Sequence, residues 1–377
     1  MTPSYTIEGY IGEVGEESLD FESNTSSIVY QESSHGFASC SIISHVHDIK
    51  QWDRVIDYPT TPIWVRWSLG IREGREIFGA WKKVYFSEGK IQYRRDSCEL
   101  RLDGFDYGYF LAENSRNKVF KNMRVSEMVE SIAEAQKIKE EFVECEETDG
   151  KLTLYQCGES DFQFISKSLL SRAVSVGGRS DYYFFTRDGY GIVFRSPDLS
   201  KDSKFTIYVA PSEPLTGVAD QPGVEIYFSR GEVSSNLSWA CDFQGFDSEK
   251  KVPLHFTAVD NTVVSQNQKL APNSPYVDGV SRNVQLPSDL CEPSAIPRMF
   301  MNRGKAIWSR HYRDRFSVRL TATPVFQIYP LDIVDCVIRT GSGDHFLSGR
   351  YLIHSVTQRV SKVSFDTILD LRRRECR

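Results

Sequence analysis

One short segment reads Asp181-Tyr-Tyr-Phe-Phe-Thr-Arg-Asp-Gly-Tyr-Gly-Ile-Val-Phe194, and it predicts a β-hairpin. Two runs of aromatic and β-branched residues flank the turn Arg187-Asp188-Gly189. An Asp-Gly pair favours a tight hairpin turn because both residues tolerate a positive φ angle. This local signal places a pair of strands near the middle of the chain, and the neighbouring elements can be assigned outward from it.

Upstream of the hairpin, apolar residues recur with the period of a helix. The first stripe is made of Val125, Met128, Val129, Ile132 and Ala133, with Ser126 as the expected N-cap. The second is made of Phe162, Ile165, Leu169, Leu170 and Ala173, with Ser160 or Asp161 as its cap and an end near Gly177-Gly178. Together with the hairpin, these helices predict a small α+β domain over residues 114–215.

Short strand-like runs separated by turns lie on both sides of this domain. Runs such as Ile63-Trp-Val-Arg-Trp and Cys98-Glu-Leu-Arg-Leu predict a first antiparallel tube-like β-barrel over residues 1–113. Similar runs predict a second barrel formed by 216–257 and 308–373. Residues 258–307 are rich in Asn, Ser and Pro, so we expect an irregular insertion or arm that wraps a neighbour. The expected fold class is α+β, mainly β.

Composition limits the class of protein. The chain has 377 residues, a formal net charge of −6 and 25% charged residues, as in an ordinary globular protein of two or three domains. The mild acidity argues against a binder of duplex nucleic acid. We expect no membrane segment and no secretory signal, and hence synthesis in a cytoplasm. The eight cysteines form no CxxC pair, which favours free thiols over a zinc ribbon.

Few residues suggest chemistry. His45-Val-His47 has the spacing of two ligands on one strand, but without a third ligand it is only a weak metal candidate. Gly341-Ser-Gly-Asp-His brings together Ser342, Asp344 and His345, and a hairpin loop is the better interpretation than a catalytic triad. G-x-S-x-G and phosphate-loop motifs are missing from the sequence. We therefore assign no catalytic residue and no cofactor, and expect a protein that is not an enzyme.

Several segments resemble one known family in their order along the chain. Val125-Ser-Glu-Met-Val-Glu-Ser-Ile-Ala is similar to the helix that follows the first barrel of phage baseplate hub proteins. Gly158-Glu-Ser-Asp-Phe-Gln-Phe-Ile is similar to another segment of that family, and an aromatic hairpin follows it in both. Pro330-Leu-Asp-Ile-Val-Asp-Cys-Val and Ser348-Gly-Arg-Tyr-Leu-Ile-His-Ser-Val-Thr resemble the closing strands of the second barrel. The family includes late-control protein D and the N-terminal half of type VI secretion spike proteins.

The resemblance implies a structural role in the virion tail, after assembly in the host cytoplasm. Three copies would form a ring in which six barrels match the hexameric tail tube, or a distal tail protein, on one side. The other side would meet a trimeric central spike. The channel would hold the tape-measure protein and later pass DNA without binding it specifically, helped by acidic side chains for which Asp366 and Asp370 are candidates. The insertion at 258–307 departs from the family pattern.

Two other functions fit the composition. The 18 Tyr, 23 Phe and 6 Trp residues could stack on sugars in a host-surface carbohydrate-binding or adhesion protein. A cell-wall hydrolase could instead assemble its site from scattered carboxylates. The oligomeric state separates these possibilities, because only the hub requires a trimer.

Overall fold

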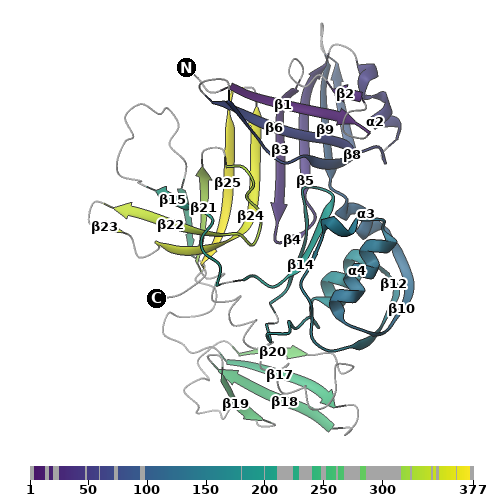
Figure 1. Ribbon diagram of the computed structural model, residues 1–377, viewed down its shortest axis with the longest axis vertical. Helices are drawn as coiled ribbons and strands as arrows, with labels where there is room; N and C mark the ends of the chain where they lie inside the picture. The colour runs from purple at the N-terminus through teal and green to yellow at the C-terminus, as the bar shows by residue number, and fades with distance from the viewer. Residues whose placement is uncertain are drawn as a thin grey trace.

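A computed structural model gives the architecture (Figure 1). It describes residues 4–12, 17–19, 25–46, 49–58, 60–71, 75–93, 98–179, 181–198, 200–209, 224–228, 240–247, 252–259, 262–266, 281–285, 316–322, 325–340, 343–344, 348–361 and 363–373. Strands dominate, and most of them pair antiparallel. The expectation of a mainly β chain is thus confirmed.

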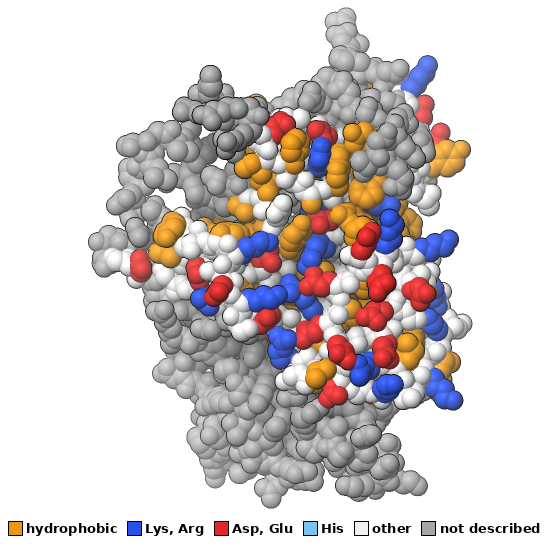
Figure 2. All heavy atoms as spheres, viewed as in Figure 1, with side chains coloured by type: hydrophobic (Ala, Val, Ile, Leu, Met, Phe, Trp, Pro, Cys, Tyr) orange, Lys and Arg blue, Asp and Glu red, His pale blue; other side chains and the backbone are white. Residues whose placement is uncertain are grey.

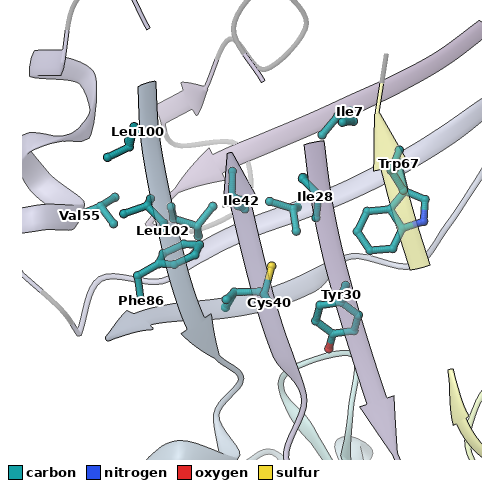
Figure 3. Packing of buried hydrophobic residues seen from close by; sticks show 14 of the residues in the cluster. Ile7, Ile28, Tyr30, Cys40, Ile42, Val55, Trp67, Phe86, Leu100 and Leu102 are labelled. Carbon is teal, nitrogen blue, oxygen red and sulfur yellow. The ribbon is translucent and has the colours of Figure 1, made fainter. Parts of the chain in front are cut away.

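The first β unit contains the N-terminal strands. Its elements are β1 (Ser4–Ile11), β2 (Glu17–Leu19), β3 (Thr25–Ser33), β5 (Ser39–Val46), η1 (Ile49–Trp52), α2 (Asp53–Asp57), β6 (Ile63–Ile71), β7 (Arg75–Phe78), β8 (Lys82–Tyr93) and β9 (Cys98–Phe105). The strands pair in the order β3-β5-β9-β8-β6-β1-β2, and β7 pairs with β6. Alternate side chains from these strands point into one core, which includes Trp67, Tyr30 and Phe86 (Figure 3).

The second β unit contains the C-terminal strands. Its elements are β15 (Thr206–Val209), β16 (Val224–Phe228), β21 (Phe316–Ala322), β22 (Ile333–Thr340), β23 (Gly343–Asp344), β24 (Gly349–Ser361) and β25 (Phe365–Arg373). They pair in the order β16-β21-β25-β24, and β22 joins β24 to β15 and β23. Its core is built around Val334, Cys336, Tyr351 and Leu369.

One sheet runs through both β units. Strand β24 pairs antiparallel with β3, so that Ser355–Ser361 lie opposite Ser33–Ser27. The far ends of β24 and β25 also supply Val360 and Phe365 to the core of the first β unit. The two units therefore share backbone hydrogen bonds and core residues, and the C-terminal strands are structural parts of both.

The α+β unit lies between the two β units in the chain. Its elements are α3 (Gly108–Glu113), β10 (Ser115–Met123), α4 (Val125–Ala135), η2 (Glu140–Phe142), β11 (Val143–Cys145), β12 (Leu152–Ser160), α5 (Asp161–Gln163), the π-helical turn η3 (Phe164–Leu169), β13 (Tyr183–Arg187) and β14 (Gly191–Arg195). The hairpin β13–β14 is confirmed, and β11 and β4 (His35–Gly36) add parallel strands to its two edges. Helix α4 packs its apolar stripe into this unit's core.

The helix ends correct two expectations and confirm one. The N-cap of α4 is Arg124, whose backbone N–H donates to Glu127 Oε2 at 2.8 Å, rather than Ser126. Ser126 lies within the helix and is buried. Its hydroxyl accepts a hydrogen bond from the Thr148 backbone N–H. Ser160 does cap α5, accepting from the Gln163 N–H at 3.2 Å. The second helical segment ends at Leu169, well before Gly177-Gly178, so the expected end there is wrong.

A separate four-stranded sheet replaces part of the expected irregular insertion. It contains β17 (Ala240–Asp247), β18 (Val252–Val259), β19 (Thr262–Gln266) and β20 (Ser281–Gln285), in the order β19-β18-β17-β20. Strands β17 and β18, which we expected in the second barrel, pair here instead. The Asn- and Pro-rich composition of this segment is typical of loops, so it did not predict strands β19 and β20. These strands pair with β18 and β17, respectively. No described helix is long and apolar enough to cross a membrane.

Candidate functional site

The β13–β14 hairpin is buried on both faces, which makes it the centre of a junction between the three units. Tyr182, Phe184, Ile192 and Phe194 pack into the core of the α+β unit. Tyr183, Phe185 and Val193 point the other way and pack against the second β unit, on Leu331, Ile333 and Leu352. The aromatic run of this segment therefore packs into two cores, because alternate residues of a strand face opposite sides of the sheet.

The turn of this hairpin docks on the first β unit. Asp188 and Gly189 have φ angles of 55° and 79°, as the Asp-Gly pair predicts. The Lys83 N–H donates to the Asp188 carbonyl at 3.0 Å, and the Tyr107 N–H donates to the Gly189 carbonyl at 3.1 Å. A Cβ atom at Gly189 would lie 2.0 Å from the Lys83 carbonyl oxygen. Only glycine therefore fits between the turn and strand β8.

A buried ion cluster lies under the turn, formed by Glu32, Lys82 and Asp188 with the hydroxyls of Tyr30 and Tyr329. Lys82 Nζ lies 2.5 Å from Asp188 Oδ1 and 3.4 Å from Glu32 Oε2. The Asp188 N–H donates to Glu32 Oε1 at 2.7 Å, and the Tyr329 hydroxyl donates to Asp188 Oδ2 at 3.2 Å. The cluster joins the first β unit, the α+β unit and the second β unit through one ammonium group.

Burial and charge act in opposite directions in this cluster. Burial disfavours the ammonium of Lys82, but the adjacent Glu32 and Asp188 carboxylates outweigh it and raise the pKa of Lys82. Burial also raises the pKa of Glu32, and the attraction of Lys82 offsets this only in part.

The sequence carried one signal for these residues, because Glu32 and Lys82 occupy inward positions of strands whose other inward residues are apolar.

Asp106 forms a second buried polar contact at the same junction. Its carboxylate accepts hydrogen bonds from the Ala38 N–H at 2.8 Å, the Gly108 N–H at 2.7 Å and the Thr186 hydroxyl. These donors belong to the first β unit, to α3 and to β13. Burial raises the pKa of Asp106 to about 7, although the hydrogen bonds from Thr186, Ala38 and Gly108 favour the charged form.

The residues singled out from the sequence lie elsewhere. His45 is exposed on β5 opposite Glu99 of β9, whereas His47 lies outside the described residues. Asp344 is exposed on β23, and Ser342 and His345 also lie outside the described residues. Within the described part of the chain, no group of three or more His, Cys, Asp or Glu residues is placed to hold a metal ion.

Several acidic side chains on the described surface form ion pairs with basic ones. Figure 2 shows them interleaved with Lys and Arg over the α+β unit. Glu144 contacts Arg187 and Arg195, at 2.8 and 3.0 Å, and Glu146 contacts Arg179 at 2.6 Å. Asp370 contacts Arg319 at 3.4 Å, while Asp366 lies opposite Arg359 in the sheet. Asp370 is therefore partly neutralised within the chain.

Two ends of the long sheet are open along the described strands. Among them, β16 pairs only with β21, and β2 pairs only with β1. An edge strand presents unpaired N–H and C=O groups, which favour pairing with another chain. These edges are candidate contact surfaces for assembly.

Solved structures of other proteins have a similar architecture. No protein-family model matches the chain, and no curated protein matches its sequence. A tail protein from Neisseria meningitidis has a similar structure, with a TM-score of 0.65 and 13% identity over 98% of this chain and 97% of that one. The 43 kDa tail protein of a Shewanella oneidensis prophage matches with a TM-score of 0.59 and 12% identity, over 97% of both chains.

A third structure extends the likeness to secretion systems. It is an E. coli component of the type VI secretion system, described as structurally similar to T4 bacteriophage tail proteins. It matches with a TM-score of 0.51 and 11% identity, over 97% of this chain and 79% of that one. The chain therefore has the fold of phage tail proteins and of a type VI secretion component, as its resemblance to the baseplate hub family predicted.

Proposed function

We propose that the chain is a structural subunit of a phage tail baseplate, a trimeric hub that joins the hexameric tail tube to a trimeric central spike. The observation that carries this proposal is the likeness to a tail protein over 98% of this chain and 97% of the other. Because both β units and the α+β unit fall within that match, the whole architecture supports the role. The proposed location is the virion tail, after assembly in the host cytoplasm.

The arrangement of the β units suits such an adaptor. Three copies with two β units each would present six units to a six-fold tube, and the shared sheet would keep each pair in fixed register. The open edges β16 and β2 offer backbone groups for contacts between subunits. For the α+β domain we propose the limits 114–215. One core joins residues between Leu111 and Phe194, whereas β15, inside the C-terminal limit, pairs with β22 of the second β unit.

The charge of the chain suits a channel through which DNA passes. A net charge of −6 repels a phosphate backbone, so DNA could slide past the ring without being held. We propose that the same channel holds the tape-measure protein before ejection and that the subunit has no enzymatic activity of its own.

Reconstitution tests the adaptor role. The full chain is mixed with a tail-tube protein and a spike protein from the same virion, and the mixture is separated by size and imaged by negative-stain electron microscopy. The expected particle is a ring of this chain with the tube protein on one face and the spike on the other. The adaptor role is wrong if the three proteins elute separately under all conditions. It is also wrong if the spike and the tube protein bind each other directly and this chain attaches to only one face of that complex.

A further inference from the structure

The ion cluster at the junction contains more acid than base. Two carboxylates, Glu32 and Asp188, surround one ammonium, and the side chains of Glu32 and Lys82 are 3% and 6% exposed. Lys82 lies close to Asp188, at 2.5 Å, and about an ångström farther from Glu32, at 3.4 and 3.5 Å. Asp188 is therefore the closer partner of the ammonium, and Glu32, which faces it with both oxygens at longer distance, is a second carboxylate for one positive charge.

The neighbours of Glu32 do not remove this surplus. Its Oε1 accepts from the Asp188 N–H at 2.7 Å and from the Tyr30 hydroxyl at 3.3 Å, and both donors are uncharged. The titratable or charged groups that surround the cluster on all packed elements are Tyr30 and Glu32 on β3, Lys82 on β8, Arg187, Asp188 and Tyr190 at the hairpin turn, Asp106 after β9, Tyr329 before β22, and Lys204 above its ring. Arg187 and Lys204 contact the ring of Tyr329, and each has an acidic partner of its own, Glu144 for Arg187 and Asp332 for Lys204.

We propose that the ion cluster is a proton-controlled lock, which holds the hairpin turn tightly on the first β unit while Glu32 carries a proton and loosens when that proton is lost. In the protonated state one ammonium faces one carboxylate, and the buried charges balance. Loss of the proton leaves a second carboxylate in the junction with only long contacts to Lys82. A buried charge without a close partner is costly, so the turn opens to admit water.

The direction of the pKa shift agrees with this geometry. Burial raises the pKa of Glu32, so the folded junction takes up a proton more readily than the unfolded chain does. The stability contributed by this group is therefore present at low pH and is lost as the pH rises through the folded-state pKa. The apolar contact of Phe185 with Leu331 remains in both states, so we expect local opening of the turn rather than separation of the units.

Hydrogen exchange of the full chain tests the lock. Amide exchange is followed by mass spectrometry for peptides covering residues 186–191, from about pH 6 to about pH 9, with correction for the intrinsic pH dependence of exchange. In the wild type, protection of the turn should fall roughly tenfold or more across this range, as the proton is lost. In Glu32→Gln, which keeps an oxygen to accept the Asp188 N–H, protection should change less than about twofold. Both proteins carry Asp106→Asn in this comparison, because Asp106 contacts Thr186 and titrates in the same pH range.

A second variant keeps the test decisive if Glu32→Gln folds poorly. Asp188→Asn leaves one carboxylate for one ammonium, so Glu32 should remain ionised as the sole counter-ion and the alkaline loss of protection should disappear. Glu134→Gln, at an exposed site on α4, is the control and should follow the wild type. The lock is wrong if wild-type protection is constant with pH, or if the folded cluster variants lose protection as the wild type does.

Discussion

Lys82 and Asp188 form a 2.5 Å ion pair inside the protein, although they are 106 residues apart in the sequence. Lys82 belongs to a strand of the first β unit, and Asp188 to the hairpin turn of the α+β unit. Tyr329 adds the second β unit to the same contact. The α+β unit is therefore held against the two β units by a few buried polar groups and by the apolar faces of one hairpin.

Removal of the ammonium should destabilise the protein strongly. Lys82→Met leaves Asp188 buried without its counter-ion, and breaking a buried pair in this way costs about 3–5 kcal/mol. Urea unfolding measures the loss. The control is Lys90→Met on the exposed part of the same strand, which should change the free energy of unfolding by less than about 0.5 kcal/mol. Equal effects of the two substitutions would mean that the ion cluster does not hold the junction.

The hairpin turn should tolerate no side chain at Gly189. Gly189→Ala combines a φ of 79° with a Cβ atom 2.0 Å from the Lys83 carbonyl oxygen. Gly158→Ala is a matched control, because its φ is 74° and nothing lies within 4 Å of the added Cβ. We expect a loss of about 1–2 kcal/mol for Gly158→Ala from backbone strain. Gly189→Ala should lose at least about 1–3 kcal/mol more by thermal or urea unfolding, and similar losses would argue against a close contact with β8.

The C-terminal strand should be needed for the first β unit. Phe365 is buried in that unit's core, 6.4 Å from the ring of Trp67 and 5.2 Å from that of Phe326. Phe365→Ala should cost about 3–5 kcal/mol and change the tryptophan fluorescence. Val363→Ala, at a site that is 88% exposed, should do neither. Unchanged stability of Phe365→Ala would show that the N-terminal strands form their core without the C-terminal strand.

Asp106 should contribute a pH dependence of stability. Its pKa is raised to about 7, so between the usual pKa of an aspartate and about pH 7 the folded chain binds a proton that the unfolded chain does not. The associated stability is present at low pH and is lost as the pH rises toward 7. Acidification from about pH 8 to about pH 5 should therefore raise the free energy of unfolding of the wild type relative to Asp106→Asn. Parallel pH curves for the two proteins would contradict this assignment.

Local chemistry explains which parts of the fold could be predicted from the sequence. The turn at Asp188-Gly189, the cap at Ser160 and the stripe of helix α4 depend on residues close together in the chain, and all three are confirmed. The pairing of β24 with β3 joins residues more than 300 apart, for which no local pattern exists. The ion cluster was missed for the same reason, since Glu32 gains its partners only when distant strands meet. Strands β19 and β20 were missed because their composition is typical of loops.

The molar mass of the full chain in solution, measured by multi-angle light scattering, tests the central claim of a trimeric hub most directly. The account predicts a particle that contains three copies of the 43.1 kDa chain, with the mass of the spike added when the spike protein is bound. A particle of 43.1 kDa that stays monomeric over a wide concentration range, with and without the spike, would contradict it.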